Sequence, residues 1–148
     1  MDERIRKFGE TLATTAIARD WKGVHEMLAP WLKSRQNVNA VQAFFEDDYR
    51  EVLAGSGINE IHYPLIPYVS GNSSTLAYLR EKPSFKPQPR PIPAEVNEQN
   101  FRYWVNIQLQ CSDEQQEKLE LDFLTDFWLI VVEVDGQMEI GYWSHDPY

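Results

Sequence analysis

The side chains best suited to acid–base chemistry are a carboxylate and an imidazole near the end of the sequence. Asp126 lies on one predicted strand and His145 at the end of the next. If Asp135 and Gly136 are the central residues of a hairpin turn, Asp126 pairs with His145 across that hairpin. A neighbouring carboxylate fixes the tautomer of an imidazole, as in many acid–base sites. The pairing predicts a catalytic site or, equally, a salt bridge at a strand end.

Aromatic residues of the same strands are the candidates for binding. The hairpin register places Trp128 opposite Trp143, which is more typical of a packed cross-strand pair than of a ligand platform. Tyr63 follows His62 on a proline-interrupted strand, where the two could line a pocket or be structural. The residues predicted to bind a ligand or partner are Tyr63, Trp104, Trp128 and Trp143.

The sequence carries no pattern typical of a metal or cofactor site. Its three histidines lie far apart, and Cys111 is the only cysteine, so an internal disulfide and the usual zinc spacings are excluded. A Gly-rich phosphate loop, a nucleophile elbow and a Ser–His–Asp spacing are also missing. We therefore expect no metal and no cofactor.

Charge is divided unevenly along the chain. The formal net charge is −9, with +1 in residues 1–90 and −10 in residues 91–148. Clustered cations bind phosphate backbones, so nucleic acid and anionic membranes are excluded as expected partners. The acidic part favours a basic protein partner, or it serves only to keep a half-exposed sheet soluble.

Composition is typical of one globular domain spanning residues 1–148. Hydrophobic residues make up 43% of the 148 residues and charged residues 25%. No apolar run approaches the ~18 residues of a membrane span, and residues 1–7 lack the apolar core of a signal peptide. We therefore expect a cytoplasmic protein.

The first third of the chain predicts three helices. Asp20 is the expected N-cap of the second helix, which Pro30 should end, and Asn37 or Asn39 caps the third, which ends at Gly55. The apolar stripes are Ile5, Phe8, Leu12 and Ala16, then Trp21, Val24 and Leu28, then Val41, Phe44, Phe45, Tyr49, Val52 and Leu53.

Strands dominate the rest of the chain. Residues 58–69 predict an edge or irregular strand, because Pro64 and Pro67 cannot donate to a ladder. Ser73 or Ser74 should cap a short helix that runs through Leu79. Residues 83–93 hold five prolines and predict an extended connector inside the domain, either a stiff surface loop or a basic arm that docks on a partner.

Alternation of apolar and polar residues marks the last strands. Residues 101–110 predict a long half-buried strand, residues 121–134 a second, and a third runs through Ile140 and Trp143. Both faces of the resulting hairpin carry large apolar side chains. A sheet with two apolar faces needs two covers, so we expect a second copy of the chain, a homodimer through the sheet, to provide the second.

The order of these elements resembles the nuclear transport factor 2-like superfamily over nearly the whole chain. Two stretches carry the resemblance: residues 18–24 (ARDWKGV), similar to its helix-to-helix entry, and residues 134–143 (VDGQMEIGYW), similar to its last hairpin. The resemblance implies an α+β fold with N-terminal helices on a strongly curved, mainly antiparallel, cone-shaped sheet. It also implies a pocket at the wide end, which residues 83–93 could cover.

The resemblance leaves the function open, because the superfamily includes enzymes, adaptors and immunity proteins. Its isomerase-like members use a pocket Asp with Tyr or His partners, for which Tyr103, Asp126 and His145 are the nearest residues here. We expect a non-catalytic interaction module, an acidic dimeric domain that binds a protein partner. The alternative is an isomerase, dehydratase or cyclase type of enzyme or carrier that holds a small apolar ligand in the cone and transfers protons without a cofactor.

Overall fold

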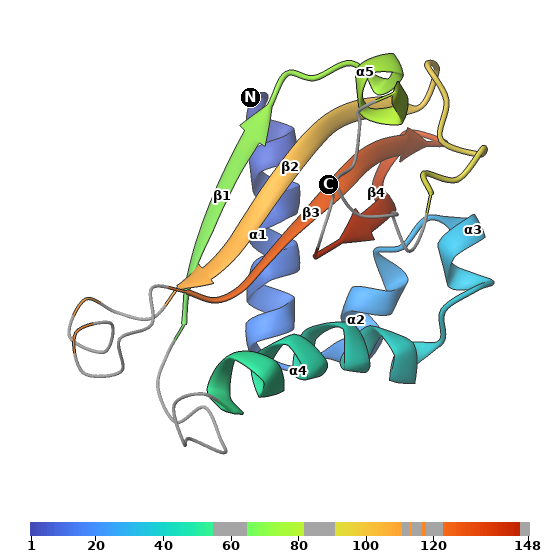
Figure 1. Ribbon diagram of the computed structural model, residues 1–148. Helices are drawn as coiled ribbons and strands as arrows, with labels where there is room; N and C mark the ends of the chain where they lie inside the picture. Colours follow the sequence, from blue (N-terminus) through green and yellow to red (C-terminus); the bar gives the residue numbers. More distant parts are fainter. Residues whose placement is uncertain (55–64, 82–90, 111–112, 114–116, 118–122, 146–148) are drawn as a thin grey trace.

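Helices packed on an antiparallel sheet make up this computed structural model (Figure 1). The structure describes residues 1–54, 65–81, 91–110, 113, 117 and 123–145. The helices are α1 (Glu3–Ile17), α2 (Trp21–Glu26), α3 (Pro30–Lys33), α4 (Val38–Ala54) and α5 (Leu76–Glu81), and the strands are β1 (Ile66–Asn72), β2 (Phe101–Gln110), β3 (Phe123–Val134) and β4 (Gln137–Ser144). The predicted α+β class is confirmed.

The four strands form one open sheet in the order β1-β2-β3-β4. β2 has the predicted bounds, and Asp135 and Gly136 form the predicted turn between β3 and β4. Both turn residues have positive φ, 51° and 81°, as an Asp-Gly hairpin turn requires. Pro67 lies in the edge strand β1, where a missing N–H is tolerated. The sheet is not closed, and its strong curvature stays a prediction.

Local signals place the N-terminal helices much as the sequence predicts. The Asp20 carboxylate accepts from the Gly23 amide at 3.0 Å, and the Asn37 side chain accepts from Ala40 at 2.8 Å. Pro30 differs from its prediction, because α2 already ends at Glu26 and Pro30 begins the short α3, in the first-turn position that tolerates proline.

The cap of α5 also differs from its prediction. Thr75 Oγ1 accepts from the Tyr78 amide at 3.1 Å, in the place expected for Ser73 or Ser74. The hydroxyl directly before the first helical residue is the one in reach of the free amides of the first turn.

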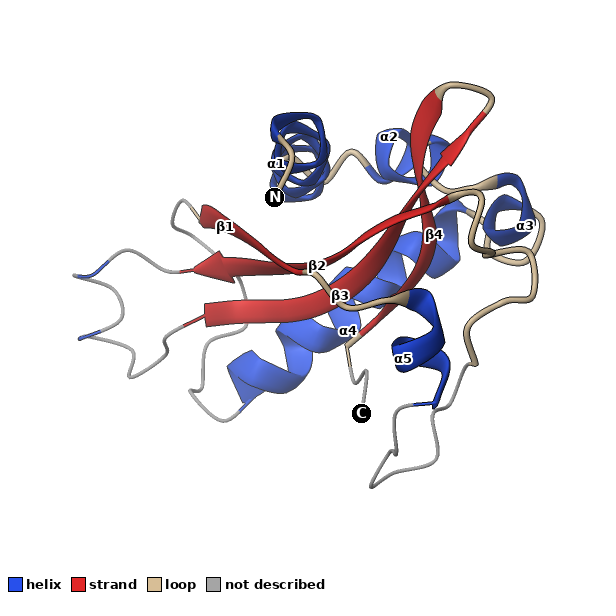
Figure 2. Ribbon diagram, turned by 90° about the horizontal axis from the view of Figure 1, so that it is seen from above, coloured by secondary structure: helices blue, strands red, loops and turns tan. Residues whose placement is uncertain are grey.

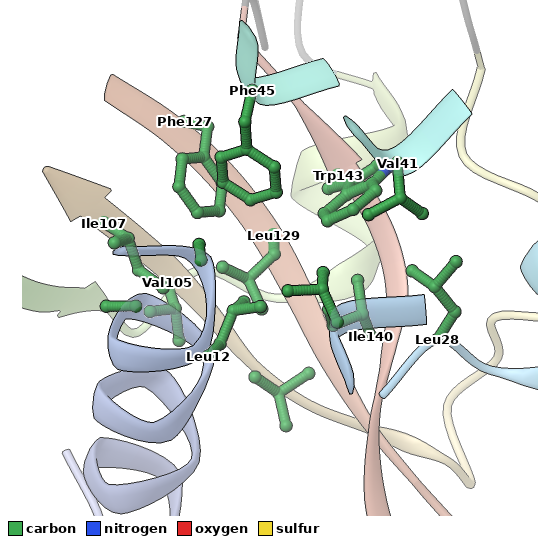
Figure 3. Packing of buried hydrophobic residues seen from close by; sticks show 14 of the residues in the cluster. Leu12, Leu28, Val41, Phe45, Val105, Ile107, Phe127, Leu129, Ile140 and Trp143 are labelled. Atoms are coloured by element: carbon green, nitrogen blue, oxygen red, sulfur yellow. The ribbon is translucent and has the colours of Figure 1, made fainter. Parts of the chain in front are cut away.

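The inner face of the sheet is packed against α1, α2 and α4. Figure 3 shows Leu12 of α1 and Phe45 of α4 reaching toward Phe127 and Leu129 of β3, and all four side chains are fully buried. Burying one Leu or Phe side chain contributes about 1.5–3 kcal/mol. This cluster is therefore the main source of the stability of the fold.

The outer face has a smaller apolar cluster, which the chain covers itself. Figure 2 shows α5 on the side of the sheet opposite α1. Leu76 and Leu79 of α5 and Val96 pack against Trp104 and Tyr142 of the sheet. The second cover expected from another copy is thus partly supplied by α5 and by residues 91–96, which we call the strap. The homodimer stays a prediction.

A bulge in β4 corrects the predicted hairpin register. The four pairs next to the turn, from Val134 with Gln137 to Val131 with Ile140, are as predicted. Ile130 then pairs with Tyr142, which leaves Gly141 as the extra residue. The bulge turns Tyr142 to the outer cluster and Trp143 to the inner one. The predicted pairs Leu129 with Tyr142 and Trp128 with Trp143 are wrong for this reason.

Several expectations lie outside the described residues. They concern residues 58–64, most of the connector 83–93, Cys111 and the glycine expected to end the third helix at residue 55. None of the described helices is long and apolar enough to cross a lipid bilayer.

Candidate functional site

The predicted register pair of Asp126 with His145 is not formed, although His145 Nδ1 lies 3.4 Å from the backbone carbonyl oxygen of Asp126. The bulge places Ser144 opposite Trp128, so the register no longer brings the two side chains together. The Asp126 carboxylate accepts a hydrogen bond from Asn106 Nδ2. His145 Nε2 lies 2.6 Å from the carbonyl oxygen of Phe44, and the imidazole stacks on the Phe44 ring. Because a carbonyl only accepts, His145 Nε2 must donate, and that nitrogen is engaged in holding β4 to α4.

Aromatic rings fill the inner face next to His145. Phe44 stacks on Trp143 with ring centroids 4.2 Å apart, and Phe45 meets Phe127 edge to face at 5.2 Å. We call Phe44, Phe45, Phe127 and Trp143 the ring cluster. It packs the inner face beside His145, whereas Asp126, on the same side of β3 as Trp128, lies on the outer face. Catalytic roles for these two residues and for Tyr103 stay predictions.

The other predicted site residues do not form one cluster. Tyr103 is half-buried on the inner face, close to Gly71 of β1. Trp104 is 2% exposed on the outer face, where it stacks on Trp128 at 5.2 Å. Tyr63 lies outside the described residues. The structure therefore does not gather these side chains into one site. Among the described binding candidates, Trp143 lines a pocket.

A pocket of about 610 Å³ lies beside Trp143. Its walls come from the end of α3 and the residues after it, from the strap and from β4. The lining residues are Leu32, Arg35, Gln36, Pro91, Ile92, Pro93, Ala94, Glu95, Tyr142 and Trp143. Tyr142 belongs to the outer cluster and Trp143 to the inner one, so the pocket lies at the β4 edge, where the two apolar layers meet. We call it the strap pocket.

The chain around the start of α3 covers the β4 edge up to the bulge. The Ile140 amide donates to Met27 and the Ile140 carbonyl accepts from Ala29, each at 2.8 Å. The carbonyl of the bulged Gly141 accepts from the Trp31 indole at 2.9 Å. Directly after the bulge, Tyr142 and Trp143 line the pocket.

The strap is anchored at both ends. The Arg80 guanidinium donates to the carbonyl oxygens of Ile92, Pro93 and Val96, which ties the strap to α5. Asn100 Nδ2 donates to the carbonyl of Glu95 at 2.9 Å. Pro91 and Pro93 further restrict the backbone, because their φ angles are fixed. The wall of the pocket is therefore held in place without a ligand.

Two side-chain pairs supply the polar groups of the pocket. Arg35 and Glu95 form an ion pair at 2.8 Å between the residues after α3 and the strap, and both side chains are exposed. Gln36 Oε1 accepts from the Trp143 indole at 3.1 Å, and the Gln36 backbone carbonyl lies 2.8 Å from His25 Nε2. Gln36 is only 9% exposed. One polar side chain is thus fixed in an otherwise mainly apolar pocket, the composition typical of small-molecule sites.

Carboxylates at the far end of the hairpin differ in environment. Hydrogen bonds from Arg4 and then Arg102 hold the pKa of Glu133 below its ordinary value of 4.5. Burial raises the pKa of Glu139, against an opposing effect of Lys33. Neither carboxylate lines the strap pocket. They bear on stability, and not on the chemistry of the pocket.

Sequence reasoning missed Arg35, Gln36 and Glu95. Nothing in their local pattern signals a site, since they meet only when the chain folds. Among the described residues, no group of three or more His, Cys, Asp or Glu side chains could hold a metal ion.

Comparison with known proteins gives no relative. No protein-family model, no curated protein and no solved structure matches the chain. The resemblance to the nuclear transport factor 2-like superfamily therefore stays a prediction that rests on the two short stretches and the element order.

Proposed function

We propose that this chain is a non-catalytic binding module that holds a small ligand in the strap pocket. The observation that carries the proposal is the pocket itself, about 610 Å³ at the β4 edge. Small-molecule sites are typically clefts of roughly 300–1,000 Å³ with mostly apolar walls and a few fixed polar groups. The walls here have this composition, and the anchored strap keeps them in place.

Two further features support binding over catalysis. The Asp126 carboxylate accepts from Asn106 on the outer face, and the His145 ring is stacked on Phe44 on the inner face, so each of the two candidate acid–base groups is engaged in a structural contact. In the strap pocket, Glu95 is paired with Arg35, and the Gln36 amide cannot act as an acid or base at ordinary pH.

A fragment screen followed by backbone and indole NMR tests this function. We expect small aromatic compounds to shift the amide signals of Ala94 and Tyr142 and the indole signal of Trp143. Ala94→Trp places a large side chain in the pocket wall and should abolish these shifts. Ala77→Trp is the matched control, because Ala77 is exposed on α5 and does not line the pocket. Binding that survives Ala94→Trp unchanged would contradict the proposal.

A second candidate function is protein interaction through the outer face of β1. Ile66 and Tyr68 are 50% and 55% exposed, and as alternate residues of an edge strand they share one face. This apolar pair supports the predicted homodimer through the sheet. Sedimentation should show a concentration-dependent dimer that Tyr68→Lys weakens, with Tyr78→Lys on α5 as the control. A single monomeric species at every concentration would remove this candidate.

A further inference from the structure

The Gln36 side chain presents an unused hydrogen-bond donor to the strap pocket. An indole N–H can only donate, so the contact with Trp143 must be made by Oε1 of Gln36, which fixes the orientation of the amide. Nε2 then has no hydrogen-bond partner within the part of the chain that the structure describes. Because Gln36 is 9% exposed and lines the pocket, a ligand acceptor is the natural partner of Nε2.

The neighbouring Arg35 adds further donors. A guanidinium carries five N–H groups and no acceptor, and here one nitrogen, Nη2, donates to Glu95. This ion pair is solvent-exposed, with 54% and 40% of the two side chains accessible. Exposed ion pairs are weak, because solvent screens them, so another carboxylate could replace Glu95 on Arg35 at little cost.

We propose that the strap pocket binds an apolar carboxylic acid, with the ligand carboxylate accepting from Gln36 Nε2 and the Arg35 guanidinium. The inference rests on the proposed ligand-binding function and specifies its ligand class. Leu32, Ile92 and the two strap prolines contact the apolar body of the ligand. Glu95 acts as an internal competitor that occupies Arg35 until the ligand arrives.

The balance of charges favours a monoanion over other anions. One guanidinium and one neutral amide match a single carboxylate, whereas phosphate sites usually combine several cations or backbone amides. The chain carries a net charge of −9, which opposes dianions at long range. A neutral ligand could not replace the negative charge of Glu95 beside Arg35.

Isothermal titration with a matched pair of probes tests the ligand class. The probes are 3-phenylpropionate and 3-phenylpropionamide, which share the apolar body and differ in the charge of the head group. We expect the acid to bind the unmodified chain about tenfold more tightly than the amide, because charge-assisted hydrogen bonds are stronger than neutral ones. Equal affinity of the two probes would overturn the proposal.

Three variants assign the head group to its partners. Arg35→Gln should weaken binding of the acid about tenfold and leave the amide nearly unchanged. Glu95→Gln should tighten binding of the acid about two- to fivefold, because the internal competitor loses its charge. Gln36→Glu keeps an acceptor for Trp143 but removes the donor, and it should abolish binding of the acid. Lys22→Gln, an equal charge change on α2 away from the pocket, is the control.

The outcomes separate this inference from the function on which it rests. If neither probe binds and the fragment screen is also empty, the ligand-binding function fails. If the amide binds as well as the acid and Glu95→Gln has no effect, the pocket binds ligands but the carboxylate assignment is wrong. Binding only to peptides with a free C-terminal carboxylate would also overturn the small-acid assignment. Arg35 and Glu95 are exposed, so these two variants report on binding even if Gln36→Glu does not fold.

Discussion

The two sides of Trp143 are built in opposite ways. Toward α4, its ring stacks on Phe44. The Phe45 ring meets it edge to face, with the ring centroids 5.8 Å apart. Toward the strap, the same residue lines an open pocket together with Tyr142 and Gln36. The side made by α4 is closed, and the side made by the strap is hollow.

The difference between the two sides follows from the side chains that α4 and the strap present to Trp143. Helix α4 presents consecutive phenylalanines, whose flat rings stack or meet edge to face until no room remains. The strap presents prolines on a backbone held by Arg80, so it cannot move inward to close the gap. An anchored, proline-rich strap makes the wall of a pocket, whereas a helix with aromatic rings makes a core.

We expect the largest loss of stability from a substitution in the ring cluster, on the closed side of Trp143. Phe127 is fully buried in the ring cluster, and Phe127→Ala removes its ring from contact with both phenylalanines of α4. We expect a loss of about 3–5 kcal/mol in the free energy of unfolding, measured by urea denaturation. Tyr68→Ala, an exposed ring of the same sheet, should change it by less than about 0.5 kcal/mol. A comparable loss for both would mean that the ring cluster is not the source of stability.

We expect a smaller loss of stability from a substitution at the bulged Gly141, which lies between Ile140 and Tyr142. A Cβ on Gly141 would lie 2.6 Å from Val132 Cγ1 and 3.2 Å from Val96 Cγ2. Gly141→Ala should therefore cost about 1–3 kcal/mol and disturb the contact of Trp143 with Gln36, seen as a shift of the Trp143 indole signal.

The double variant is the control for the bulge. Val132→Ala makes room for the new methyl group, so the double variant should be more stable than the sum of the two single effects predicts. Strict additivity would show that the steric contact with Val132 does not determine the cost.

The smallest effect compares the two carboxylates at the hairpin end. The pKa of Glu133 is lowered, so its ionised form stabilises the fold above pH 4.5 and that stability is lost as the pH falls through the lowered pKa. The pKa of Glu139 is raised, so stability falls as the pH rises from 4.5 through the raised pKa. At pH 7 the unfolding temperature of Glu133→Gln should be lower than that of the unmodified chain, and that of Glu139→Gln higher.

Thermal unfolding between pH 3 and pH 7 checks this pair of variants. Each serves as the control of the other, because both remove one negative charge from the same hairpin. A shift of both unfolding temperatures in the same direction would show that net charge, and not the local environment, determines the effect.

Local patterns predicted most of the elements. The alternation in residues 101–110 predicted β2 with its bounds, and the Asp-Gly pair predicted the turn and the first four pairs of the hairpin. The caps at Asp20 and Asn37 followed from side chains that can reach free amides. The short α3 was missed because Pro30 was interpreted as a stop, although the same ring also suits the first turn of a helix.

The sequence by itself determined most of the helices and strands, because those preferences depend on neighbours a few positions away. Only the tertiary structure decided the faces of Tyr142 and Trp143, since the bulge at Gly141 arises where the strand meets Trp31 and Val132. The strap pocket also depends on the tertiary structure. Its polar groups, Arg35, Gln36 and Glu95, come from segments about 60 residues apart, and no local pattern encodes a contact between segments that meet only when the core has packed.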